Sequence, residues 1–157
     1  MAAPDTIFLV RHAKAGERRT WTDDDVDRPL SKKGWRQAEA IAKRLATKGA
    51  TTLHSSSYVR CMQTLEPLAD HLDTKVREEP RLFEDQPFEP VLELLQEVPH
   101  GAVLCSHGDI IPAVIQALHR RGMKIETPPD WRKSSVWVLT RTKGRVTKGK
   151  VWPPAVI

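Results

Sequence analysis

The chain has 157 residues, a length typical of one domain, and folding at this length buries roughly 70% of the unfolded chain's surface, enough for one hydrophobic core. Charged residues make up 29% of the chain, and no apolar run approaches the ~18 residues of a membrane-spanning helix, which excludes a membrane-spanning protein. The net charge is +5, but residues 132–157 hold seven basic and no acidic residues, so the rest is slightly acidic. This basic segment is either a solvated edge or an electrostatic funnel for an anionic partner.

The first half of the chain alternates apolar runs with amphipathic segments. Residues 6–10 form a continuous apolar run, typical of a strand buried on both faces of a parallel sheet. The polar stretch 11–28 cannot contribute to a core and is expected to be a functional loop or flap. A helix then follows Ser31, its expected N-cap, and ends near Gly49.

The same alternation continues to the end of the chain. We expect strands over residues 51–55, 74–77 and 102–105, helices over 58–72, 89–98 and 110–121, and an antiparallel pair of strands over 135–140 and 145–151. Strands alternating with helices predict an α/β fold with a mostly parallel central sheet, covered by helices on both faces. We see no repeat or linker, so residues 1–157 are expected to form a single domain.

Cysteine usage and the start of the sequence predict a cytoplasmic protein. Residues 1–5 show no secretory pattern, and Cys61 and Cys105 are the only cysteines. We therefore expect two free, buried thiols and no disulfide. Nucleic acid is not the expected partner, because no recognition motif is present and aromatic residues make up only 6% of the chain.

Positively charged and imidazole side chains follow the predicted strands at their carboxyl ends, where open α/β sheets bind ligands. Arg11 and His12 follow the first strand, Arg60 lies near the start of a helix after the second, and His107 follows the fourth. Arg guanidinium groups match phosphate oxygens, and a neutral imidazole is a competent nucleophile near pH 7. Together these residues predict a site for phosphoryl chemistry, although each taken alone is more often a surface or capping residue.

Four segments of the sequence resemble the motifs of one protein family. Residues 9–13 (Leu-Val-Arg-His-Ala) resemble the "RHG" signature of the histidine phosphatase superfamily, which also contains the cofactor-dependent phosphoglycerate mutases. Residues 28–34, 55–64 and 106–108 are similar to the segments that follow it in that family. The short length resembles the SixA-like branch, named for a phosphohistidine phosphatase. Parts of the chain also resemble the phosphatase domains that are fused to MutT-type Nudix hydrolases.

The resemblance implies a three-layer α/β/α sandwich of the phosphoglycerate mutase type, and it implies roles for single residues. His12 would be the nucleophile that becomes phosphorylated, and Arg11, Arg60 and His107 would form the phosphate pocket. Two positions depart from the usual motifs: Ala13 replaces a glycine, as is common in the SixA-like branch, and Ser57 replaces a proline. Neither a metal nor a cofactor is expected.

The proton donor is less specific in the sequence. A leaving alkoxide needs a general acid, and the family commonly places a carboxylic acid after the third strand. Glu84 fits this context, with Asp85 as its neighbouring alternative, and a solvent-facing turn carboxylate is the competing interpretation. A phosphohistidine substrate would need the acid less, because imidazole is the better leaving group.

Further residues are candidates for substrate binding. Lys14, Arg28, Ser57 and Gly108 follow or flank the motif residues and could contact phosphate or substrate. The aspartates between residues 23 and 27 lack the spacing of a calcium loop and are interpreted as solvated.

The resulting prediction is a metal-independent phosphatase that forms a phosphohistidine intermediate and acts on a phosphorylated partner, with phosphohistidine of a protein as the leading substrate. Small phosphorylated nucleotides or polyphosphates are the alternative substrate class. A module that binds phosphorylated partners or nucleic acid without catalysis is the alternative outside enzymes.

Overall fold

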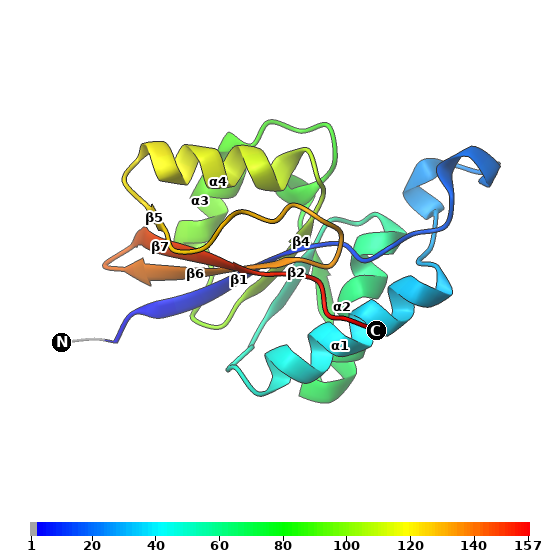
Figure 1. Cartoon of the computed structure of the whole chain (residues 1–157), viewed down its shortest axis with the longest axis horizontal. Helices are drawn as coiled ribbons and strands as arrows, with labels where there is room; N and C mark the ends of the chain where they lie inside the picture. Colours follow the sequence, from blue (N-terminus) through cyan, green and yellow to red (C-terminus); the bar gives the residue numbers. More distant parts are fainter. Residues whose placement is uncertain (1–2) are drawn as a thin grey trace.

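The computed structural model describes residues 3–157, and its strands form one mixed seven-stranded sheet in the order β3-β2-β4-β1-β6-β7-β5 (Figure 1). The strands are β1 (Asp5–Arg11), β2 (Leu53–Ser55), β3 (Val76–Glu78), β4 (Val103–Ser106), β5 (Lys124–Ile125), β6 (Val136–Thr142) and β7 (Arg145–Trp152). The first four are parallel to one another, and β6 pairs with both β1 and β7 in antiparallel fashion. The predicted α/β class with a mostly parallel sheet is confirmed. The sequence missed β5, because two residues carry no periodic pattern.

Two layers of helices cover the sheet, as predicted. The helices are α1 (Lys32–Ala46), α2 (Val59–Leu72), α3 (Glu89–Glu97) and α4 (Ile110–Arg120). Figure 1 shows α3 and α4 above the sheet and α1 and α2 below it. Two separate clusters of buried apolar side chains fill the two spaces between sheet and helices. The fold is therefore a three-layer α/β/α sandwich, as the resemblance implied.

The apolar run of β1 supplies both clusters, which explains why it shows no alternation. Ile7 and Leu9 pack with the α3 and α4 side chains, whereas Phe8 and Val10 pack with those of α1 and α2. All four side chains are buried. Successive side chains of a strand point to opposite faces, so a strand at the centre of a covered sheet must be apolar at every position.

The helix ends follow the sequence signals with one shift. Ser31 caps α1, and its Oγ accepts a hydrogen bond from the Gly34 backbone N–H at 3.1 Å. The helix ends earlier than expected, at Ala46, and Gly49, with φ +84°, lies two residues beyond the C-cap. Gly122 directly follows the C-cap of α4 and has φ +108°. Glycine adopts this left-handed conformation at a lower energetic cost than other residues, so it is favoured at this position.

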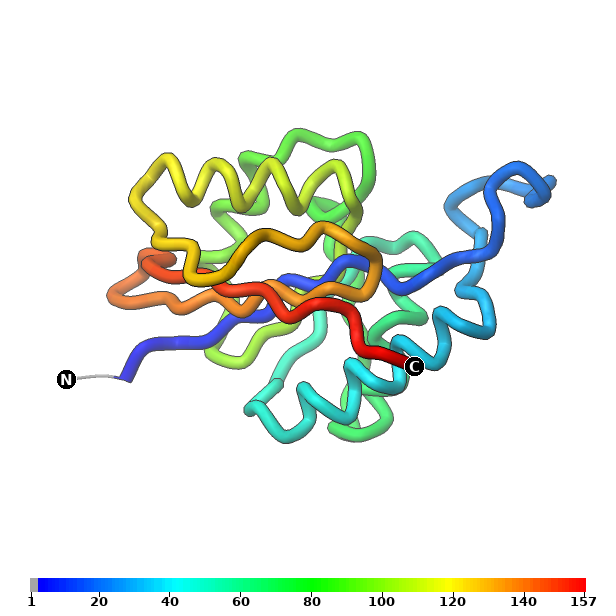
Figure 2. Tube along the Cα trace, viewed as in Figure 1, coloured from blue at the N-terminus to red at the C-terminus, as the bar shows by residue number. Residues whose placement is uncertain are grey.

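The polar stretch after β1 forms the predicted flap. It contains two single-turn 3₁₀ helices, η1 (Arg18–Thr20) and η2 (Asp25–Asp27), and a bridge between Ala15 and Leu30 closes its base. Figure 2 shows this segment in blue, extending beyond the end of the sheet. The flap therefore lies next to the carboxyl ends of the parallel strands.

The basic C-terminal segment has two different environments. Arg132 and Lys133 lie near the carboxyl end of β1, whereas Arg141 is buried and binds Asp5 and two backbone carbonyls.

Cys61 and Cys105 are free and buried, as predicted. Across residues 3–157, no helix combines the length and the apolar character needed to cross a membrane.

Candidate active site

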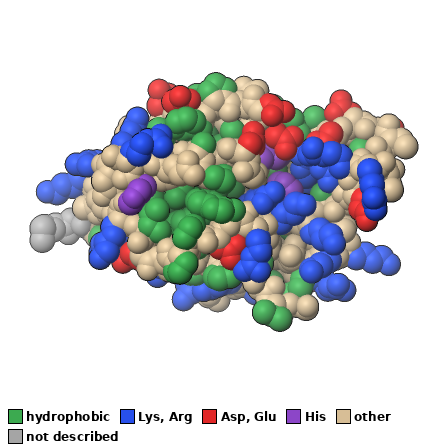
Figure 3. Space-filling model, turned by 45° about the horizontal axis from the view of Figure 1, so that its top comes forward, with side chains coloured by type: hydrophobic (Ala, Val, Ile, Leu, Met, Phe, Trp, Pro, Cys, Tyr) green, Lys and Arg blue, Asp and Glu red, His purple; other side chains and the backbone are tan. Residues whose placement is uncertain are grey.

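A pocket of about 390 Å³ opens at the carboxyl ends of β1 and β4, beneath the flap. Most of the predicted site residues line this pocket. The full lining consists of Arg11, His12, Lys14, Ala15, Gly16, Glu17, Arg18, Arg28, Arg60, Glu84, Gly108, Asp109 and Lys133. Figure 3 shows histidine side chains in purple at this hollow, with blue basic and red acidic side chains gathered around them. The sheet edge that the sequence analysis indicated is thus the place where these groups meet.

His12 follows β1, and one nitrogen of its imidazole ring forms a hydrogen bond with the main chain. Its backbone N–H donates to the Ser106 carbonyl of β4 at 3.1 Å, which fixes the main chain. Its Nδ1 lies 2.8 Å from the Ala13 carbonyl oxygen. A carbonyl only accepts, so Nδ1 carries the proton and the Nε2 lone pair is free.

The surroundings of His12 keep its imidazole neutral. The side chain is only 5% exposed, and this burial is the main cause that lowers its pKa from 6.5 to about 3. The hydrogen bond to Ala13 opposes the shift, while electrostatic interactions with His107, Arg60 and Arg11 add to it. A neutral Nε2 at pH 7 has the electron pair that a nucleophile needs.

Arg11 projects from the end of β1 against the main chain that follows β4. Its Nη1 donates to the Trp131 carbonyl oxygen at 2.6 Å, and its Nε has no hydrogen-bond partner in the described part of the chain. A Cβ atom built on Gly108 would lie 2.7 Å from the Arg11 Cζ atom. Gly108 thus makes room for this guanidinium.

Arg60 lies in the first turn of α2 and is only 1% exposed. Two groups of Asp25 hold it: Nη1 donates to the backbone carbonyl at 2.9 Å and Nη2 to the carboxylate at 3.1 Å. Nη2 also lies 3.4 Å from the Glu84 carboxylate. A buried guanidinium needs such partners, and the flap supplies one of them.

His107 follows β4 and is fully buried. Its Nε2 lies 2.8 Å from Ser56 Oγ and 3.5 Å from Cys61 Sγ, whereas Nδ1 has no hydrogen-bond partner among the described residues. The imidazole rings of His107 and His12 have their centroids 5.6 Å apart. His107 therefore lies beside the ring of His12 but, unlike Arg11 and Arg60, does not itself line the pocket.

The two carboxylate candidates lie differently. Glu84 lines the pocket, with its carboxylate 3.4 Å from Arg60 Nη2 and 3.9 Å from His107 Nδ1. Asp85 is exposed, has φ +61°, and donates its backbone N–H to the Asp109 carboxylate at 2.8 Å. Asp85 does not line the pocket, so the geometry favours Glu84 as the group near the reacting atoms.

Three of the four candidate substrate-binding residues line the pocket, and one does not. Lys14, Arg28 and Gly108 line the pocket, and Arg28 binds the Asp25 carboxylate at 2.9 Å and the Gly16 carbonyl at 2.6 Å. Ser57 does not line it. The preceding residue, Ser56, is the one that contacts His107.

Three residues that organise the site were not predicted from the sequence. Asp25 binds Arg60 and Arg28, but nothing distinguishes it from its neighbouring aspartates in the sequence. Ser56 binds His107. Thr64 accepts from the Ala13 backbone N–H at 2.9 Å and donates to the Arg60 carbonyl at 2.7 Å, which joins the loop after β1 to the start of α2. Its place one turn after Arg60 on α2 was the available signal.

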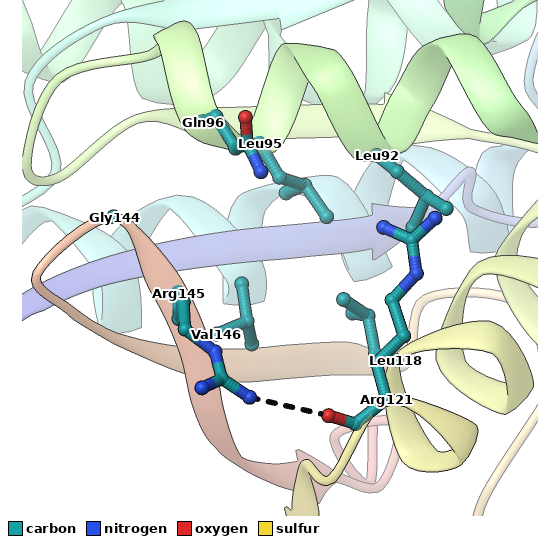
Figure 4. Close-up of a pocket in the computed structure, with 8 residues that line it drawn as sticks. All are labelled: Leu92, Leu95, Gln96, Leu118, Arg121, Gly144, Arg145 and Val146. Atoms are coloured by element: carbon teal, nitrogen blue, oxygen red, sulfur yellow. Dashed lines mark hydrogen bonds between the residues drawn. The ribbon is translucent and has the colours of Figure 1, made fainter.

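Another pocket, of about 340 Å³, lies at the opposite end of the sheet (Figure 4). Leucines of α3 and α4 form its floor, and the Arg145 guanidinium donates to the Arg121 carbonyl at 3.4 Å across its mouth. Neither a histidine nor a carboxylate lines it. None of the predicted site residues lines this pocket.

Comparison with known proteins identifies the family. The model of the histidine phosphatase superfamily (branch 1) matches residues 7–86, about half of the chain, and the chain belongs to this superfamily. The predicted enzyme class, a histidine phosphatase, is thereby confirmed. Within residues 3–157, no group of three or more His, Cys, Asp or Glu side chains is arranged to hold a metal ion.

Individual relatives refine the comparison. The chain is 39% identical over 148 residues to the 8-oxo-(d)GTP phosphatase of Mycolicibacterium smegmatis, and this match covers 90% of the chain but only 46% of that protein. The chain thus spans about half the length of this relative. Two solved structures are also similar. One is the putative phosphohistidine phosphatase SixA of Nakamurella multipartitia, with a TM-score of 0.74 and 25% identity over 99% of both chains. The other is the protein histidine phosphatase SixA complexed with tungstate, with a TM-score of 0.74 and 23% identity over 96% of both chains. The latter supports the fold alone.

Proposed function

We propose that the chain is a metal-independent phosphatase that works through a phosphorylated His12. The observation that carries this proposal is the free, neutral Nε2 of His12 in a pocket that two guanidinium groups also line, with the ring of a second histidine, His107, beside it. Phosphoryl transfer demands chiefly positioning and neutralisation of charge, and Arg11, Arg60 and His107 supply both.

The proposed reaction has two steps, the phosphorylation of His12 and the hydrolysis of the phosphohistidine. The lone pair of His12 Nε2 attacks phosphorus, the bond from phosphorus to the leaving group breaks, and the leaving atom takes that electron pair together with a proton from Glu84. Water then attacks the phosphohistidine, Glu84 accepts a proton from this water, and the electrons of the broken P–N bond return to Nε2. Inorganic phosphate leaves, and His12 is again neutral.

Protein-borne phosphohistidine is the first candidate substrate. The likeness to the SixA protein at 25% identity over the full length of both chains supports it. A shallow pocket also suits a phosphate that is presented on a larger surface.

Small phosphorylated nucleotides or polyphosphates are the second candidate. The observation that favours them is the 39% identity to an 8-oxo-(d)GTP phosphatase, which covers nine-tenths of this chain. Because that relative is about twice as long, its activity need not reside in the half that matches.

Phosphate release from a phosphohistidine peptide, measured in EDTA with the wild type and with His12→Ala, tests this proposal. We expect turnover that persists in the chelator and falls by at least about 10³-fold in the variant. Turnover of nucleotides but not of the peptide would select the second substrate class. Loss of activity in EDTA with recovery in magnesium, or tight phosphate binding without any turnover, would contradict the mechanism.

A further inference from the structure

A second pocket lies beside the candidate active site, and its polar wall is basic. Its volume is about 550 Å³, and the start of α1, residues 132–133 and the C-terminal segment enclose it. The lining residues are Arg11, Lys14, Lys33, Gln37, Arg132, Lys133, Pro154, Ala155, Val156 and Ile157. Arg11, Lys14 and Lys133 line the candidate active site as well, so the two pockets adjoin along these side chains.

The positive charge of this basic pocket is poorly compensated. Neither Asp nor Glu lines it, and within residues 3–157 no carboxylate forms an ion pair with Lys14, Lys33 or Lys133. Arg132 alone has a carboxylate partner, Asp130 at 2.6 Å. Burial and four neighbouring cationic side chains lower the pKa of Lys133. The cationic groups thus repel one another until an anion joins them.

The start of α1 adds to this positive potential. Lys32 and Lys33 occupy the first turn, which contains no acidic residue, although the partial positive charge of a helix N-terminus disfavours cations there. Gln37 of the next turn accepts a hydrogen bond from the Lys14 backbone N–H at 2.9 Å. This contact fixes α1 against the loop that follows His12, so the wall of the basic pocket is held at a constant place beside the nucleophile.

We propose that the basic pocket binds a second phosphate group of the same substrate molecule, next to the phosphate that His12 attacks. This inference rests on the proposed function, because it takes the pocket around His12 as the place of the reacting phosphate. A group with several negative charges matches a wall of several unpaired cations. The substrate is then a diphosphate or a longer phosphate chain, such as a nucleoside diphosphate or an inorganic polyphosphate, and a lone phosphohistidine would leave the pocket unfilled.

Calorimetric binding of orthophosphate and of imidodiphosphate, which resists hydrolysis, tests the inference without needing turnover. We expect the wild type to bind imidodiphosphate at least about tenfold more tightly than orthophosphate. Lys33→Gln and Arg132→Gln alter residues that line only the basic pocket, and each should reduce this ratio several-fold. Lys32→Gln is the matched control, because it removes an equal charge from the same exposed helix turn but does not line the pocket.

Each outcome has a clear meaning. Equal affinity for the two anions overturns the second phosphate site. An equal drop of the affinity ratio in Lys32→Gln and Lys33→Gln overturns it too, since the anion would then respond only to the overall positive charge of the surface. Hydrolysis of p-nitrophenyl phosphate, measured on the same samples, reports the proposed function separately. Activity without a preference for imidodiphosphate would refute the site alone, and the preference without activity would refute the catalytic proposal alone.

Discussion

The guanidinium of Arg11 lies against the main chain of Gly108, where a Cβ atom would come within 2.7 Å of both Cζ and Nη2. Arg11 comes from the end of β1, and Gly108 follows β4, its parallel neighbour in the sheet. A histidine precedes the glycine and another follows the arginine, so this contact couples the two histidine motifs. Only a residue without a side chain allows the observed approach.

Gly108→Ala should therefore impair activity more than stability. The added methyl group displaces the mobile end of Arg11 rather than backbone, so the free energy of unfolding should change by less than about 1 kcal/mol. Misplacing one charged phosphate contact should lower kcat/KM by about 10- to 100-fold. Kinetics with p-nitrophenyl phosphate and urea unfolding measure the two effects.

A double-mutant cycle provides the control for Gly108→Ala. In an Arg11→Ala background the added methyl group meets no guanidinium, so Gly108→Ala should have little further effect on kcat/KM. Full additivity of the two losses would show that Gly108 acts through something other than Arg11.

Gly34 makes a similar close approach, but to backbone. It lies in α1, where alanine is ordinarily favoured by about 1 kcal/mol. A Cβ atom there would lie only 1.9 Å from the Lys14 carbonyl oxygen. We expect Gly34→Ala to destabilise the fold by roughly 2 kcal/mol or more, because either α1 or the loop after His12 must move. An unchanged or higher unfolding midpoint in urea would refute this account.

Much of the fold could be predicted because its signals are local. The continuous apolar run of β1 and the Ser31 cap are each recognisable from a few adjacent residues. The placement of Arg11, His12, Arg60 and His107 followed from strand ends alone, since parallel strands bring their carboxyl ends to one edge. Arg11, His12 and Arg60 line one pocket, as expected, whereas His107 lies buried beside the ring of His12 without lining it.

The remaining features depend on contacts between distant segments. Asp25 reaches Arg60 across 35 positions, and no pattern marks which aspartate of the flap does so. The basic C-terminal segment was open to two interpretations, and the structure divides it: Lys133 faces the candidate site, whereas Arg141 is buried against Asp5. The sequence could not separate these positions, because charge alone does not reveal which strand end a residue approaches.

The lowered pKa of His12 predicts acid sensitivity of the fold. Unfolded, this histidine titrates near 6.5, whereas in the fold its pKa is about 3, so the unfolded state binds the extra proton first as pH falls. The stabilisation is complete above pH 6.5 and is lost progressively between 6.5 and about 3. From pH 7 to pH 5 the loss amounts to about 2 kcal/mol.

Urea unfolding at pH 7 and pH 5 measures this loss. His12→Gln should lose less stability over this interval than the wild type, by about 2 kcal/mol. His71→Gln is a control for the removal of a histidine from outside the pocket, because His71 is exposed in the last turn of α2. Equal acid sensitivity of the wild type and His12→Gln would contradict the neutral buried imidazole.

The position of Glu84 predicts a dependence on the leaving group. Its carboxylate lies in the pocket near Arg60 and His107, where it can deliver a proton to the leaving atom. Glu84→Gln should lower kcat/KM by about 10²- to 10⁴-fold for an alkyl phosphate, whose alkoxide needs that proton. For p-nitrophenyl phosphate, whose leaving group is stable as an anion, the loss should be much smaller.

Asp85→Asn is the matched variant for this experiment. Asparagine tolerates the left-handed backbone at this position, and Asp85 lies outside the pocket. We therefore expect Asp85→Asn to affect both substrates alike and only slightly. If Asp85→Asn shows the dependence on the leaving group and Glu84→Gln does not, the proton comes from Asp85. If neither variant shows it, neither carboxylate supplies the proton to the leaving atom.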